Sequence, residues 1–140
     1  MSSMKRRQEL SGIHVVVIDD DDDDDDDART IMKMVLESHG AFVMVAASAR
    51  DGLAGLGQVA PDVLLVDLTM PIEDGYWFID QLKAQARHGG RTQPSAIAVS
   101  AYGEGHEERA IRAGFDAFVP KPFDVEKLCE TIQQLANRKT

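Results

Sequence analysis

A chain of 140 residues is long enough for one domain with its own core and too short for two domains of ordinary size. Hydrophobic residues make up 44% and charged residues 28%, which is typical of a soluble globular protein, and no apolar run approaches a membrane span. The formal net charge is −9, but nine of the acidic residues are the consecutive aspartates Asp19–Asp27, and the other 15 balance 15 Lys and Arg. Because acidic and basic residues balance outside this run, the chain lacks the excess of positive charge that is typical of a nucleic-acid-binding domain.

Cellular location is predicted from the cysteine count and the N-terminus. The single cysteine, Cys129, can form no internal disulfide, which favours a reducing compartment. Lys5, Arg6 and Arg7 are followed by polar residues rather than by the apolar region of a signal peptide. We therefore expect a cytoplasmic protein without a membrane segment.

The first half of the chain alternates strand-like and helix-like segments. Ile13–Ile18 is β-branched and apolar, as a strand buried on both faces should be. Ala28–His39 has helical period and is followed by Gly40, which ends helices well. Ala41–Ala47 predicts a second strand, and Ser48 is a suitable N-cap for the next helix. The apolar stripe expected for the first helix consists of Ile31, Met32, Val35 and Leu36.

The second half continues the alternation. Val63–Val66 predicts a strand that ends at Asp67, and a helix is expected from Gly75 to the loop around residues 88–94. Ala96–Ser100 and Ala117–Val119 predict the last two strands, with a helix over 104–113 between them and another from about residue 124. The final helix is expected to bury Val125, Leu128, Cys129, Ile132, Leu135 and Ala136.

Five successive βα units predict an α/β fold with a five-stranded parallel sheet covered by helices on both faces. In such sheets the functional site lies at the carboxyl ends of the strands. Those ends carry Asp19 and Asp20, Asp67, Ser100 and, just after the last strand, Lys121. Clustered carboxylates need a neutralising cation, and a hard, oxygen-liganded ion such as Mg²⁺ fits them. A nucleophile, a metal and cationic groups together are the parts that phosphoryl transfer requires.

Three motifs in the correct order resemble those of response-regulator receiver domains. Val63–Tyr76 (VLLVDLTMPIEDGY) is similar to the phosphoacceptor signature, Ser100-Ala101 to the switch pair, and Val119–Phe123 (VPKPF) to the Lys-Pro motif. The resemblance implies a (βα)5 flavodoxin-like doubly wound fold over residues 12–137. Residues 1–11 would then be an N-terminal extension and 138–140 a tail. The stretch Ala96–Phe123 resembles receivers attached to hybrid sensor kinases most, and stand-alone regulators resemble it too.

The resemblance also implies roles for individual residues. Asp67 would be the phosphoacceptor, Lys121 would contact the phosphoryl oxygens, and Ser100 would move to hydrogen-bond them. Phe118 takes the place of the aromatic that changes rotamer with the switch. The metal ligands would be Asp19, Asp20, Asp67 and the backbone carbonyl of Thr69. The Lys121–Pro122 bond is expected to be cis.

The function implied is a two-component signalling switch that catalyses its own Mg²⁺-dependent phosphorylation and slow dephosphorylation, without turning over a metabolite. The phosphodonor would be a sensor histidine kinase or a histidine phosphotransfer protein, and the domain would be a monomer or weak dimer. A phosphorylation-independent interaction module on the same fold is the alternative.

The aspartate run departs from the family pattern, because Asp21–Asp27 supplies seven residues where about three are usual. Two readings stay open: a solvated, self-repelling loop or a second cation site. The metal-binding pair could also be Asp20 and Asp21. The four histidines show no ligand spacing, so no zinc site is predicted, and Cys129 is expected to act as a small hydrophobe.

Overall fold

The computed structural model describes residues 9–19, 27–56, 60–68, 75–89, 93–100, 106–121 and 124–137. These residues form one parallel sheet of five strands, with the strand order β2-β1-β3-β4-β5, and five helices. The strands are β1 (His14–Ile18), β2 (Phe42–Ala46), β3 (Val63–Asp67), β4 (Ser95–Ser100) and β5 (Ala117–Pro120). The helices are α2 (Asp27–Ser38), α3 (Ala49–Gly55), α4 (Gly75–Gly89), α5 (His106–Ala113) and α6 (Val125–Asn137). The predicted α/β architecture is confirmed, with element ends within about two residues of those expected.

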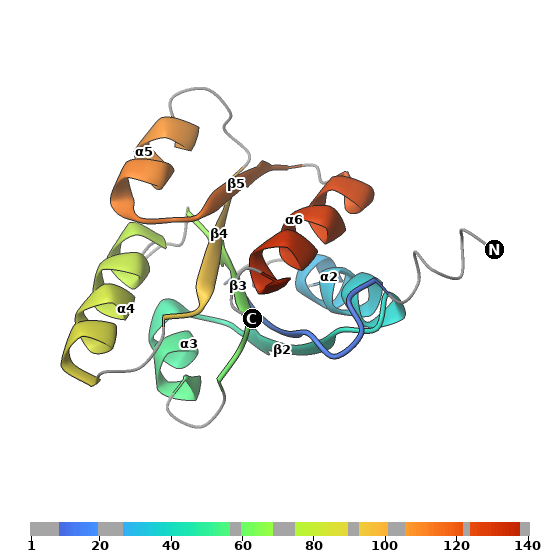
Figure 1. Ribbon diagram of the computed structural model, residues 1–140, viewed down its shortest axis with the longest axis horizontal. Coiled ribbons are helices and arrows are strands. Elements are labelled where there is room, and N and C mark those ends of the chain that lie inside the picture. The colour runs from blue at the N-terminus through green and yellow to red at the C-terminus, as the bar shows by residue number, and fades with distance from the viewer. Residues whose placement is uncertain are drawn as a thin grey trace.

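The helices cover both faces of the sheet. Figure 1 shows α2 and α6 on one side and α3, α4 and α5 on the other. Alternate residues of the central strands pack into two separate cores, one on each face of the sheet. In β1, Val15 and Val17 lie in the core under α2 and α6, whereas Val16 and Ile18 lie in the core under α3, α4 and α5. This double burial explains why the central strands are continuous apolar runs rather than alternating ones.

The helix after β1 packs on one face and the helix after β3 on the other, although β1 and β3 are hydrogen-bonded neighbours. Such a reversal is the topological switch point of a doubly wound sheet, where the loops diverge and leave space for a ligand. The fold therefore predicts a functional site at the carboxyl ends of β1 and β3.

Two details of the predicted helix faces were wrong. Ile31 was expected in the buried stripe of α2, but it is 56% exposed, while Met32 and Leu36 are buried. Val125 was expected in the stripe of α6 and is 38% exposed, because it begins the helix and lies outside the core that the later turns enter. The rest of the α6 stripe, from Leu128 to Ala136, is buried as expected.

Among the described residues, no helix combines the length and the apolar character needed to cross a membrane.

Candidate functional site

The carboxyl ends of β1 and β3 deliver Asp19 and Asp67. Asp67 is the last residue of β3, and the ladder continues past it because the Leu68 N–H donates to the Val99 carbonyl at 2.9 Å. Asp19 directly follows β1, and its N–H donates to the Ala46 carbonyl at 3.1 Å. Both backbones are therefore fixed by the sheet, and both carboxylates are set at the same edge.

The end of β5 adds a cation to this edge. The Lys121 N–H donates to the Ser100 carbonyl at 2.9 Å, which places Lys121 beside the end of β4. Its Nζ lies 3.6 Å from Oδ2 of Asp19 and 3.6 Å from Oδ2 of Asp67. One ammonium thus bridges two carboxylates from neighbouring strands.

These three side chains lie in a partly enclosed setting. The side chains of Asp19 and Asp67 are 13% and 9% exposed, and that of Lys121 is 28% exposed. Charges that are shielded from solvent interact more strongly than surface pairs. The 3.6 Å separations are those of ion pairs rather than short hydrogen bonds, so the ammonium can shift toward another anion.

Ser100 and Phe118, the two other predicted site residues in the described part of the chain, lie on β4 and β5. Ser100 ends β4 and is fully buried, pairing with Pro120 of β5. Phe118 pairs with Ala98 and is partly buried against the core under α4 and α5. Both residues therefore lie on the two strands that lead to the ion-paired cluster. Asp20, Thr69 and the Lys121–Pro122 peptide bond lie outside the described residues, so those predictions stay untested.

Gly75, the first residue of α4, approaches the strand end closely. A Cβ at this position would lie 2.9 Å from the Asp67 carbonyl oxygen and 3.0 Å from the Leu68 Cα. Any larger residue would push the start of α4 away from the end of β3. This contact gives a physical reason for the glycine at the end of the loop after Asp67.

The donor set of the cluster suits a hard divalent ion. Asp19 and Asp67 supply carboxylate oxygens from two adjacent strand ends, and their common contact with Lys121 shows that the spot between them already favours positive charge. Mg²⁺ is typically held by one or two carboxylates with water and phosphate oxygens completing its shell. The described residues therefore fit a magnesium ion.

Comparison with known proteins identifies the family. The family model "Response regulator receiver domain" matches residues 15–133. This chain belongs to the response regulator receiver domain family. In two-component signalling, receiver domains of response regulators act as phosphoacceptors.

Relatives and solved structures agree with this assignment. An uncharacterized 14.6 kDa protein from Leptolyngbya boryana is 36% identical over 107 residues, which cover 76% of this chain and 79% of that protein. Response regulator Rre1 of Synechocystis is 30% identical over 112 residues, covering 79% of this chain and 48% of Rre1, so the chain spans about half the length of that relative. The receiver domain of the Francisella response regulator 1452 has a TM-score of 0.80 at 24% identity and covers 92% of this chain and 100% of that domain, which shows a shared fold.

Proposed function

We propose that this domain is a phosphoacceptor switch in which Asp67 receives a phosphoryl group. The observation that carries the proposal is the position of the Asp67 carboxylate, at the carboxyl edge of the sheet and 3.6 Å from a lysine that also contacts Asp19. A nucleophile beside a displaceable cation is the arrangement that phosphoryl transfer needs.

Asp19 and Asp67 would hold Mg²⁺, together with Asp20 and the backbone carbonyl of Thr69. When bound, Mg²⁺ supplies positive charge that offsets the charge on the oxygens of the transferring phosphoryl group. The metal-binding pair is assigned to Asp19 and Asp20 because β1 ends at Ile18.

In the proposed transfer, a carboxylate oxygen of Asp67 attacks the phosphorus of a phosphohistidine. The new P–O bond forms as the P–N bond breaks, and the donor imidazole keeps the electron pair and takes up a proton. Lys121 pairs with the phosphoryl oxygens, and Ser100 moves to hydrogen-bond them while Phe118 changes rotamer. Water later hydrolyses the acyl phosphate, which resets the switch.

The phosphodonor would be a sensor histidine kinase or a histidine phosphotransfer protein. One solved structure with the same fold is the receiver domain of a signal transduction histidine kinase from Syntrophus aciditrophicus, with a TM-score of 0.76 at 21% identity. We propose a cytoplasmic domain spanning residues 12–137, a monomer or weak dimer, with no direct contact to nucleic acid or membrane.

A phosphorylation-independent interaction module is the second candidate, and the run Asp19–Asp27 is the feature that favours it. In the sequence, the seven aspartates Asp21–Asp27 follow the acidic pair, where about three residues are usual in the family. A loop of this charge could serve partner binding without phosphoryl chemistry.

Acetyl phosphate, a small donor that needs no kinase, separates the two candidates. The protein is incubated with acetyl phosphate and Mg²⁺, or with acetyl phosphate and a chelator, and its intact mass is recorded. We expect one phosphoryl group, added only with Mg²⁺ and removed by hydroxylamine, which cleaves acyl phosphates. A protein that stays unmodified with Mg²⁺ present would favour the interaction module.

A further inference from the structure

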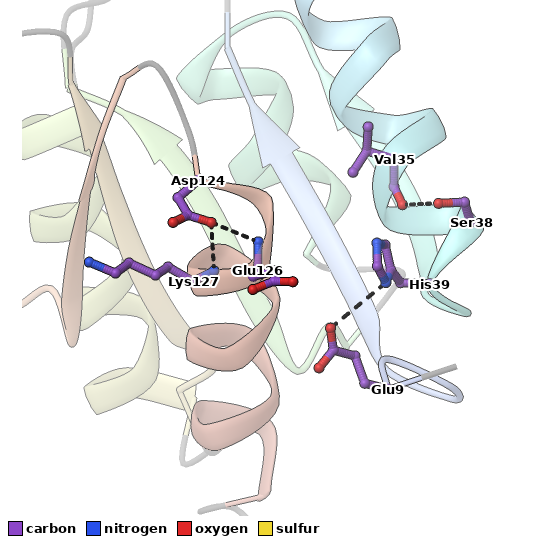
Figure 2. Close-up of polar contacts among 7 residues, drawn as sticks. All are labelled: Glu9, Val35, Ser38, His39, Asp124, Glu126 and Lys127. Atoms are coloured by element: carbon purple, nitrogen blue, oxygen red, sulfur yellow. Dashed lines mark hydrogen bonds and ion pairs between the residues drawn. The ribbon is translucent and has the colours of Figure 1, made fainter. Parts of the chain in front are cut away.

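A second cluster of reactive side chains lies near the amino end of β1, whereas the acidic cluster lies at its carboxyl end. Glu9 is in the turn that leads into β1, His39 directly follows α2, and Cys129 is in α6. Figure 2 shows Glu9 and His39 facing each other beside the start of β1. Their closest polar atoms, Oε1 of Glu9 and Nδ1 of His39, are 3.7 Å apart.

The backbone holds the first two residues in this relation. Leu10, next to Glu9, is fully buried in the core, and its N–H donates to the His39 carbonyl at 3.0 Å. Gly40 has a φ of +101°, and a Cβ there would lie 3.0 Å from the backbone of Ser11. The turn before β1 and the end of α2 are therefore in close contact, and only glycine suits position 40.

Cys129 is the third member of the cluster. The thiol belongs to the buried stripe of α6 and is fully shielded from solvent. One ligand atom from each of Glu9, His39 and Cys129 lies within 4.8 Å of the other two. Around a tetrahedral zinc ion with bonds of about 2.0–2.3 Å, neighbouring ligand atoms are roughly 3.3–3.8 Å apart. A contraction of about one ångström would bring the three atoms to those distances.

The geometry points to a metal site formed by Glu9, His39 and Cys129 that takes Zn²⁺ or a similar borderline transition ion. Sulfur, imidazole nitrogen and carboxylate oxygen together are a zinc-type donor set, whereas Mg²⁺ takes oxygen ligands alone. The side chains of Glu9 and His39 are 18% and 19% exposed, so solvent reaches two of the three proposed ligands. Water would take the fourth position, as in zinc sites with three protein ligands.

Metal binding would change the protonation of the thiol. Burial, followed by the charge and hydrogen bonding of Glu9, raises the pKa of Cys129 to about 12, so the metal-free protein holds a neutral S–H. On binding, the S–H bond breaks, the thiolate coordinates Zn²⁺, and the proton passes to solvent.

Cobalt provides a direct test, because a Co²⁺–thiolate bond gives a near-ultraviolet charge-transfer band and Cys129 is the only cysteine in the chain. The purified protein is first saturated with Mg²⁺, which occupies the acidic cluster, and is then titrated with Co²⁺. We expect the band to appear with one equivalent of Co²⁺ and to disappear when Zn²⁺ is added. Oxygen ligands elsewhere, including the aspartate run, cannot produce this band.

Matched variants assign the ligands. Glu9→Gln and His39→Gln should each weaken Zn²⁺ binding by at least about tenfold. Removing a residue that only supports a metal ligand already lowers metal affinity by about 10- to 100-fold, so loss of a ligand itself should cost no less. Cys129→Ala should abolish the band, and His14→Gln, at an exposed histidine, should leave it unchanged. No band in the wild type, or a Zn²⁺ affinity unchanged in Glu9→Gln and His39→Gln, would overturn the proposal. Glutamine is similar in size to glutamate and histidine, so the two Gln variants should fold normally. They test the site even if the substitution at the buried Cys129 disturbs folding.

Discussion

At the amino end of the sheet, Asp62 and Asp116 each accept a backbone N–H: that of His14 at 2.8 Å and that of Ala96 at 2.9 Å. At the carboxyl end, Asp19 and Asp67 instead face the ammonium of Lys121 at 3.6 Å. A backbone N–H is a fixed neutral donor, whereas an ammonium on a flexible stem can turn to another anion. The same residue type is therefore structural at one end and suited to chemistry at the other, and its contacts decide which.

The largest difference between the two ends of the sheet should appear when one aspartate is replaced at each end. Asp67→Asn keeps the side-chain volume but removes the nucleophile, so we expect no labelling by acetyl phosphate. Asp116→Ala removes the acceptor for the buried Ala96 N–H, which should cost about 1–3 kcal/mol of unfolding free energy and leave labelling intact. Intact-mass spectrometry and urea unfolding measure the two effects. Loss of labelling in the Asp116 variant, at a temperature where it is folded, would remove the distinction between the ends.

Lys121→Met should separate metal binding from phosphoryl transfer. The ammonium and a bound Mg²⁺ compete for the same two carboxylates, so removing it should tighten Mg²⁺ binding. The rate of labelling should nevertheless fall by about 10²-fold or more, the effect of losing one group that stabilises transition-state charge. Calorimetric Mg²⁺ titration and timed mass spectra measure both quantities. If labelling kept its rate in this variant, Lys121 would have no part in the transfer.

Magnesium should stabilise the wild-type domain against heat, because an ion that binds only the folded site shifts the unfolding equilibrium. At about 100 times its dissociation constant, the expected gain is about 2.7 kcal/mol. Thermal melts with and without Mg²⁺, matched in ionic strength with KCl, measure this gain. Asp67→Asn should show a smaller shift, since one ligand charge is lost. Equal shifts in the two proteins would indicate that Mg²⁺ binds elsewhere, for example on the aspartate run.

A smaller, pH-dependent effect is expected from Cys129, near the amino end of β1. Its pKa rises from 9.0 to about 12 in the folded protein, so the unfolded chain loses the thiol proton first as the pH rises. The contribution of the protonated Cys129 thiol to the free energy of unfolding is therefore fully present below pH 9 and is lost progressively up to about pH 12. Cys129→Ala should therefore lose less stability than the wild type between neutral pH and about pH 10.5, as measured by urea midpoints. Parallel pH profiles for the two proteins would contradict the assigned pKa.

Much of the fold was predictable because burial on both faces leaves a visible signature in the sequence. The apolar runs around Val15 and Leu64 indicate central strands, and the carboxyl ends of parallel strands lie at the same edge of the sheet. Asp67 and Lys121 could thus be placed together from the sequence alone. The run Asp19–Asp27 gave less information, since nine identical residues contain no register. The end of β1 at Ile18 makes Asp19 the first acidic residue after the strand.

Other features could not be read from the sequence because they depend on packing between distant segments. Glu9, His39 and Cys129 are separated by about 30 and 90 positions and have no ligand spacing along the chain, so the proposed zinc-type site could not be predicted from the sequence. The exposure of Ile31 also depends on where α2 meets the sheet. Helical period identifies an apolar stripe but not its exact width.

The central claim, that Asp67 accepts the phosphoryl group, is tested most directly by locating the modification. The wild-type protein is phosphorylated with acetyl phosphate and Mg²⁺, reduced with borohydride to convert aspartyl phosphate to homoserine, digested and sequenced by mass spectrometry. We expect homoserine at position 67 and at no other aspartate. Homoserine within residues 19–27, with Asp67 unchanged, would contradict the account.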